Sequence, residues 1–162
     1  MRSMPSPRPQ VTVVGAAECD EHLSRLAFET GRELARAGAI LLCGGRGGVM
    51  AAACAGARSG GGLTVGVLPG ADASESPPNP DLDVALWSGL GQARNLVLVL
   101  SGRAVVAIGG GWGTLSEVAL ALKHGRRVVL LESWELQRPD GASEPHLQRA
   151  TSPAEAVALA LR

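Results

Sequence analysis

Two glycine clusters, each placed between an apolar run and a helical pattern, constrain the fold of this 162-residue chain most strongly. The first cluster, residues 44–48, reads Gly-Gly-Arg-Gly-Gly and follows the apolar run 39–43. The second, residues 109–114, reads Gly-Gly-Gly-Trp-Gly-Thr and follows the run 104–108. A short apolar run that ends in glycine and leads into a helix is the strand–turn–helix unit of α/β proteins. The sequence therefore predicts parallel strands with glycine turns at their carboxyl ends.

The rest of the chain continues this alternation. Apolar runs predict strands at 11–15, 39–43, 63–68, 104–108 and 128–131, and helical spacing predicts helices at 20–36, 49–57, 115–123 and 153–161. Ser152 and Pro153 are typical of the start of the last helix, and Gly38 is typical of the end of the first. Residues 71–80 and 134–149 are polar and predict loops.

The segment 90–100 is ambiguous, because its apolar residues suit either a strand paired with 104–108 or a helix. A helix is preferred, since parallel strands need a crossover connection between them. The resulting fold class is α/β, with a doubly wound parallel sheet of Rossmann type in a single domain. Ligand sites in such folds lie at the carboxyl ends of the strands.

Charge and cysteine content narrow the classes of protein further. Fifteen basic and fifteen acidic residues give a formal net charge of zero, which argues against nucleic acid or a membrane as a partner. Cys19, Cys43 and Cys54 include no Cys-x-x-Cys pair, so no disulfide framework is expected. Cys19 and His22 lack two further ligands, and no metal is expected. We predict a cytoplasmic protein with a disordered tail at residues 1–9 and one domain at 10–162.

The glycine clusters are candidate phosphate sites. Glycine lets the backbone approach an anion closely, and free N–H groups at a helix start then bind it. The alternative is that the glycines only make tight turns, but two such clusters in one sheet favour a ligand. No Gly-x-Gly-x-x-Gly or Gly-x-x-x-x-Gly-Lys-Ser/Thr motif occurs, which disfavours dehydrogenases and nucleoside triphosphatases. The predicted ligand-binding residues are Gly44, Gly45, Arg46, Gly47, Gly110, Gly111, Trp112, Gly113 and Thr114.

Two charged residues are candidates for chemistry beside these clusters. Glu117 follows Thr114 by three residues, so helical geometry turns it toward the glycine turn, where a carboxylate can orient water or hold ribose hydroxyls. The alternative is a first-turn glutamate that stabilises the helix dipole in a capping box with Thr114. Arg94 is the only cation between residues 82 and 101, and a guanidinium suits a phosphate or a departing base. Its alternative is a solvated charge on a helix.

Three further residues keep two interpretations each. Arg46 is either a second anion contact or a partner in a salt bridge across the end of the sheet. Trp87 and Trp112 either stack on a flat ring near the site or pack against the protein.

The segments 43–50, 92–95 and 109–117 together resemble the Lonely Guy family, whose members were once mislabelled as lysine decarboxylases. The order and spacing of the motifs match over nearly the whole chain. The resemblance implies a Rossmann-fold homodimer that hydrolyses the N-glycosidic bond of a nucleoside 5′-monophosphate such as AMP or a cytokinin riboside monophosphate. The family motif Pro-Gly-Gly-x-Gly-Thr-x-x-Glu corresponds to Gly109–Glu117, and the family's essential arginine corresponds to Arg94. Arg94 and Glu117 are therefore the predicted catalytic residues.

The chain departs from the hydrolase pattern at two places. Gly109 replaces the proline of the motif, and Gln92-Ala93-Arg94-Asn95 replaces a basic His-x-Arg-Lys stretch. These departures are similar to the branch that includes molybdenum cofactor carrier proteins, which bind a phosphorylated pterin. The leading hypothesis is a purine nucleoside monophosphate phosphoribohydrolase that requires no cofactor. The alternative is a carrier with molybdenum cofactor as its bound ligand.

The sequence also predicts that the chain associates with copies of itself. The Ala-rich helix at 49–57 and the apolar segment 96–100 supply more nonpolar surface than one small sheet needs to cover. A homodimer or higher homo-oligomer is expected, with a small phosphorylated heterocycle as the other partner.

Overall fold

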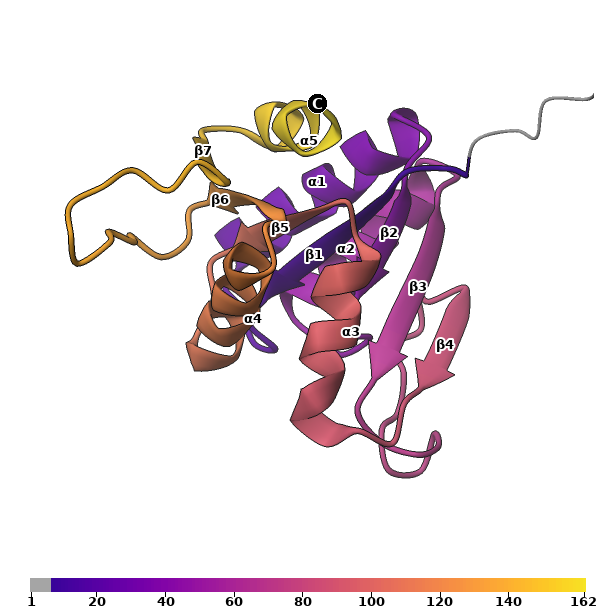
Figure 1. The fold of residues 1–162 in the computed structure, drawn as a ribbon. Helices are drawn as coiled ribbons and strands as arrows, with labels where there is room; N and C mark the ends of the chain where they lie inside the picture. The colour runs from indigo at the N-terminus through magenta and orange to yellow at the C-terminus, as the bar shows by residue number, and fades with distance from the viewer. Residues whose placement is uncertain (1–6) are drawn as a thin grey trace, which may run out of the picture.

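A seven-stranded sheet, parallel throughout, forms the centre of the computed structural model, which describes residues 7–162. The strand order is β4-β3-β2-β1-β5-β6-β7, so β1 lies in the middle and the chain winds outward from it in both directions (Figure 1). The strands are β1 (Gln10–Gly15), β2 (Ile40–Cys43), β3 (Leu63–Leu68), β4 (Val84–Trp87), β5 (Ala104–Ile108), β6 (Arg127–Leu131) and β7 (Leu147–Ala150). The predicted doubly wound α/β sheet is confirmed.

Helices cover both faces of the sheet (Figure 1). One face carries α1 (Glu21–Arg36), α2 (Val49–Ser59) and α5 (Pro153–Leu161). The other carries α3 (Arg94–Ser101), preceded by the 3₁₀ turn η1 (Gly91–Ala93), and α4 (Trp112–Lys123). The preferred helical interpretation of residues 90–100 is therefore confirmed, because α3 makes the crossover between β4 and β5. None of the helices among residues 7–162 is both long and apolar enough to cross a bilayer.

Local sequence signals set the helix boundaries. The Asp20 side chain accepts a hydrogen bond of 2.8 Å from the N–H of Leu23 and caps α1. Ser152 caps α5 in the same way, with Pro153 at the first helical position as predicted. The helix α4 begins at Trp112, three residues earlier than the sequence pattern suggested.

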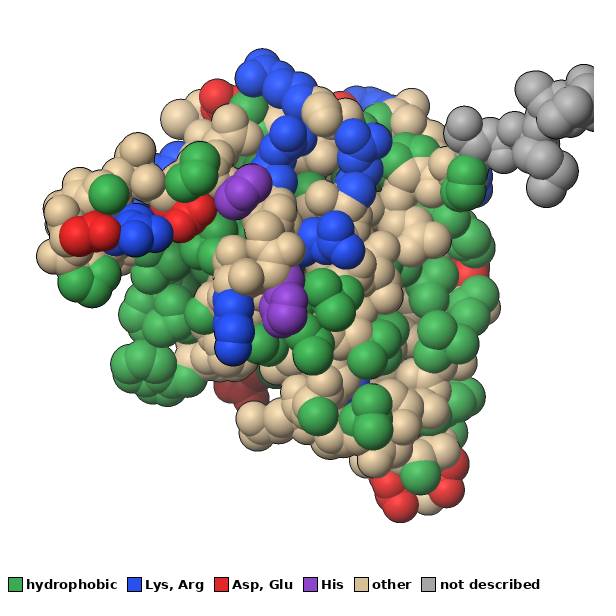
Figure 2. Space-filling model, in the orientation of Figure 1, with side chains coloured by type: hydrophobic (Ala, Val, Ile, Leu, Met, Phe, Trp, Pro, Cys, Tyr) green, Lys and Arg blue, Asp and Glu red, His purple; other side chains and the backbone are tan. Residues whose placement is uncertain are grey.

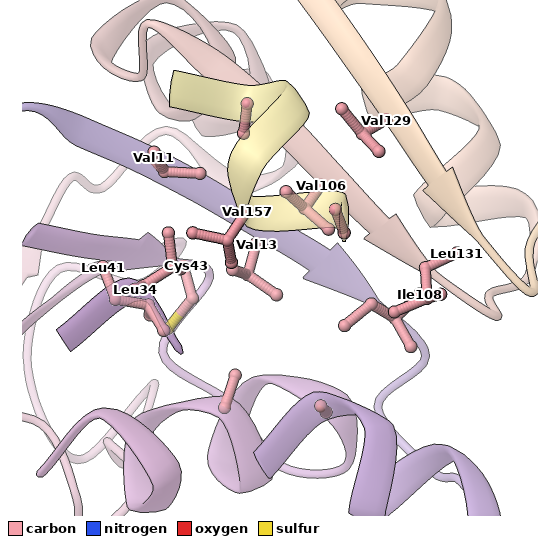
Figure 3. Packing of buried hydrophobic residues seen from close by; sticks show 14 of the residues in the cluster. Val11, Val13, Leu34, Leu41, Cys43, Val106, Ile108, Val129, Leu131 and Val157 are labelled. Atoms are coloured by element: carbon pink, nitrogen blue, oxygen red, sulfur yellow. The ribbon is translucent and has the colours of Figure 1, made fainter. Parts of the chain in front are cut away.

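The core is largest between the sheet and the α1, α2 and α5 layer. Figure 3 shows Val157 of α5 beside Val11, Val13 and Val106 of the central strands. On the same face α1 and α2 pack backbone against backbone. A Cβ added to Gly56 of α2 would lie 2.6 Å from the carbonyl carbon of Phe28 in α1, closer than real Cβ contacts. Glycine is therefore required at this crossing.

Two strands were not predicted from the sequence. Both β4 and β7 lie at the edges of the sheet, and the polar segment 134–149, predicted as a loop, contains most of β7. Residues 1–6 of the predicted tail lie outside the described residues. Of the remaining tail residues, Arg8 donates a hydrogen bond of 3.0 Å from Nε to the carbonyl oxygen of Gly38.

Candidate functional site

A cavity of about 610 Å³ opens at the carboxyl edge of the sheet, where β1 meets β5. This is the point at which the winding direction of the sheet reverses, and doubly wound folds bind ligands there. Its wall is formed by segments that follow β1, β2, β3 and β5 and by the start of α3. The lining residues are Gly15, Ala16, Ala17, Arg46, Met50, Pro69, Gly91, Gln92, Arg94, Asn95, Gly111, Trp112, Gly113, Thr114, Ser116 and Glu117.

The second glycine cluster presents free backbone donors to this cavity. Within residues 7–162, the N–H groups of residues 110–114 donate no hydrogen bond to the protein. Two carbonyl oxygens of the same turn accept side-chain hydrogen bonds, because Ser133 Oγ donates to Gly109 at 2.6 Å and Trp134 Nε1 donates to Gly111 at 3.3 Å. Free donors at the start of α4, where the helix dipole is positive, form an arrangement that favours an anion.

The first glycine cluster is used differently. The N–H of Gly45 donates to Cys43 Sγ at 3.3 Å, and the N–H of Val49 at the start of α2 donates to the Ala16 carbonyl at 3.0 Å. Two of the donors around this turn are thus satisfied by the protein itself. Among the predicted residues of this cluster, Arg46 lines the cavity, whereas Gly44, Gly45 and Gly47 are absent from its lining. Gly110 of the second cluster is also absent from the lining.

Arg94 occupies the first position of α3 and is only 8% exposed. Its Nε and Nη1 atoms are buried and have no hydrogen-bond partner in the described part of the chain. A Cβ added to Gly44 would lie 3.0 Å from Nη2 of Arg94, so the absence of a side chain at position 44 makes room for the guanidinium. Burial lowers the pKa of Arg94, and the nearby Glu117 partly offsets this. The interpretation of Arg94 as a solvated helix charge is wrong.

Glu117 lies one turn into α4 and is 9% exposed. Burial raises the pKa of its carboxyl to about 7, although the charge of Arg94 acts to lower it. The capping-box alternative is not observed, because Gly111 occupies the cap position of α4 and Thr114 is a buried residue inside the helix. A carboxyl that titrates near neutral pH can both donate and accept a proton.

The structure distinguishes between the two interpretations given for each tryptophan and for Arg46. Trp112 lines the cavity and is 79% exposed, whereas Trp87 is absent from the lining and donates from Nε1 to the Ser76 carbonyl at 3.1 Å. Arg46 is exposed and forms no ion pair within the described range 7–162.

Sequence reasoning missed the third turn at the cavity. Gly15 ends β1, Ala16 and Ala17 follow it, and all three line the wall, although they match no phosphate-binding motif. The available signal was positional, because a strand predicted at the centre of a doubly wound sheet ends at the ligand site.

Comparisons with known proteins identify similar chains. A model of the SLOG cluster4 family matches residues 8–157. An uncharacterized protein of Archaeoglobus fulgidus is 44% identical over 123 residues, which cover 76% of this chain and 80% of that one.

Two solved structures cover almost the whole fold. The molybdenum cofactor binding protein of Rippkaea orientalis has a TM-score of 0.86 and 38% identity over 95% of this chain and 96% of that one. The molybdenum cofactor carrier protein of Chlamydomonas reinhardtii has a TM-score of 0.83 and 37% identity over 96% of this chain and 100% of that one.

Proposed function

We propose that this chain, which belongs to the SLOG cluster4 family, is a carrier that holds a phosphorylated pterin of the molybdenum cofactor type without cleaving it. The two similar structures, named for binding or carrying molybdenum cofactor, support a carrier over a hydrolase. Both match nearly the full length of this chain.

The observation that carries the proposal is the unpaired guanidinium of Arg94. A buried cation without a partner is costly, and it becomes favourable when an anion completes its hydrogen bonds. Residues 111–114, whose N–H groups are free, line the same cavity. A phosphate between these two groups of donors receives charge-assisted hydrogen bonds. The cavity volume of about 610 Å³ lies within the range of small-molecule pockets.

The phosphorylated pterin fits this set of donors at its anionic end. Arg94 and the start of α4 supply the anion contacts, and Gln92 and Asn95 line the same cavity with amide groups that can bond a heterocycle's edge. In this proposal Gly44 leaves space for Arg94, and Gly45 and Gly47 shape the turn. Arg46 is a further anion contact at the rim.

A second candidate function is the phosphoribohydrolase, and the position of Glu117 favours it. Glu117 is a buried carboxyl that lines the same cavity as Arg94 and the free N–H groups of residues 111–114. Such a carboxyl is suited to activate water at an N-glycosidic bond. In that reaction Arg94 would face the phosphate or the departing base. Turnover of a nucleotide therefore decides between the two functions.

The decisive experiment measures binding and turnover on the same protein. Wild-type protein is expected to bind a pterin monophosphate and AMP by calorimetry, and to release no free adenine from AMP by chromatography. Arg94→Ala should weaken binding about tenfold or more, because it removes hydrogen bonds to a charged group. Arg25→Ala, at an exposed arginine of α1, is the matched control and should bind normally. Steady adenine release that Glu117→Gln abolishes would replace the carrier with the hydrolase.

We also propose that the protein is a homodimer or a higher homo-oligomer. Leu96, Val97 and Leu100 leave an apolar strip on α3 that is 36–44% exposed, and Figure 2 shows hydrophobic side chains there and along the β4 edge. The helix α2 adds little to this surface, because its larger apolar residues are buried within the chain and only alanines of the helix are partly exposed. Light scattering at micromolar concentration tests the proposal, and a monomer would contradict it.

A further inference from the structure

A pair of tryptophans stands at the rim of the cavity. Trp112 is the first residue of α4, and Trp134 comes from the segment that follows β6. Their ring centroids are 5.4 Å apart with an angle of 40° between the planes. Trp134 is half-buried, while Trp112 remains 79% exposed. Packing in the hydrophobic core does not explain a tryptophan at position 112, because most of the surface of Trp112 is exposed to solvent.

The contacts of Trp134 explain how Trp112 is held in this exposed position. Its Nε1 donates to the carbonyl oxygen of Gly111, the residue directly before Trp112. One residue earlier in the segment, Ser133 Oγ donates a hydrogen bond to the carbonyl oxygen of Gly109. The segment after β6 therefore fixes the glycine turn by its carbonyl side. The N–H groups of the turn stay free, and the ring of Trp134 lies against the indole of Trp112.

Trp112 thus combines two binding surfaces in one residue. Its backbone N–H belongs to the run of free donors at residues 110–114, the residue lines the cavity, and its exposed indole packs against Trp134. An anion bound to these N–H groups would therefore lie close to the indole ring of the same residue. Stacking of a flat heterocycle on an aromatic side chain is sequence-tolerant and substantial for nucleobases.

We propose that Trp112, positioned by Trp134, is the stacking platform for the planar ring of the ligand and selects ring-bearing phosphates over sugar phosphates. This inference rests on the proposed function, since it concerns the ring end of the ligand whose anionic end meets Arg94 and the start of α4. The shared chemistry is a planar conjugated heterocycle joined to a phosphate. Pterins and purines both satisfy it.

The first test compares ligands with and without a ring. Affinities of the wild-type protein and Trp112→Ala are measured for a pterin monophosphate, AMP and ribose 5-phosphate. The variant should lose on the order of tenfold for the two ring-bearing ligands and less than about twofold for ribose 5-phosphate. Trp112→Phe should restore most of the lost affinity, because it retains an aromatic face. The matched control is Trp87→Phe, at a tryptophan outside the cavity lining.

The second test reads the position of the ring directly. The double variant Trp87→Phe/Trp134→Phe leaves Trp112 as the only tryptophan of the three. Its fluorescence should be quenched by the ring-bearing ligands and unaffected by ribose 5-phosphate. If the double variant fails to bind, the same measurement is made on Trp87→Phe alone, where the quenched signal comes from the rim pair.

The outcomes separate this inference from the proposed function. Equal losses for all three ligands, or none for any, would overturn the platform and leave the carrier function standing. A wild-type protein that binds none of the three ligands would overturn both. A larger loss for the pterin than for AMP in Trp112→Ala identifies the pterin as the better stacked ring.

Discussion

The buried carboxyl of Glu117 makes a specific prediction about stability and pH. In the folded protein its pKa is about 7, against 4.5 for an ordinary glutamate, because burial disfavours the charged form. Between these two pH values the folded chain holds a proton that the unfolded chain has released. The free energy of unfolding therefore falls as pH rises from about 4.5 to 7, and it remains lowered above pH 7.

The magnitude follows from the two pKa values. One pKa unit corresponds to about 1.4 kcal/mol, so the full cost of ionising Glu117 in the folded state is about 3 kcal/mol. Glu117→Gln removes this cost, because the amide has nearly the same shape and never ionises. Relative to wild type, the variant should gain about 2 to 3 kcal/mol of unfolding free energy between pH 5 and pH 8.

Urea unfolding of both proteins at pH 5, 6, 7 and 8 measures this gain. Glu21→Gln is the control, because Glu21 has a side chain that is 92% exposed and its replacement should change stability by less than about 0.5 kcal/mol at every pH. An advantage of Glu117→Gln that is the same at pH 5 and pH 8 would refute the argument. The desolvation of Glu117 would then be too small to hold its proton near neutral pH.

Three further predictions concern backbone packing and thiols. Gly56→Ala should lower the unfolding free energy by more than about 2 kcal/mol, measured in urea, because the new methyl would overlap the Phe28 carbonyl. Gly113→Ala meets no atom within 4 Å, so it should keep or raise stability by up to about 1 kcal/mol, yet weaken phosphate binding in calorimetry by narrowing the approach to the free N–H groups. A thiol reagent should label Cys19 in the native protein and all three cysteines only after unfolding, because the other two are buried.

The central part of the fold could be predicted from the sequence, and its edges could not. The strands β3 and β5 begin and end at the predicted residues, since buried parallel strands must be apolar on both faces. Edge strands have no such requirement. The sequence Leu-Gln-Arg-Ala of β7 carries no apolar run. The sequence Val-Ala-Leu-Trp of β4 is apolar but only four residues long, and the strand is largely exposed, so its short run does not mark a buried strand.

The candidate site was predictable in its glycine turns and less so in its chemistry. The placement of residues 110–114 follows from a glycine cluster between a strand and a helix. The burial of Arg94 does not follow from its own neighbours in sequence, because the space for it is made by Gly44 of another turn. The role of Trp134 was equally hidden, since it depends on a contact with Gly111 across the carboxyl edge of the sheet. Such contacts between distant segments are tertiary facts that local periodicity cannot encode.

The central position of β1 has a consequence for how this protein is made. One side of β1 pairs with β2, which follows soon after it in the chain; Val11, for example, pairs with Leu41. The other side pairs with β5, much later in the chain, where Val11 pairs with Ala104. During synthesis the first four strands can associate while this second edge of β1 is still open. The cavity does not exist until β5 and the start of α4 have emerged, and parallel pairing between distant segments is slow. A ligand can therefore bind only after β5 has joined the sheet, and by mass action it stabilises that folded state.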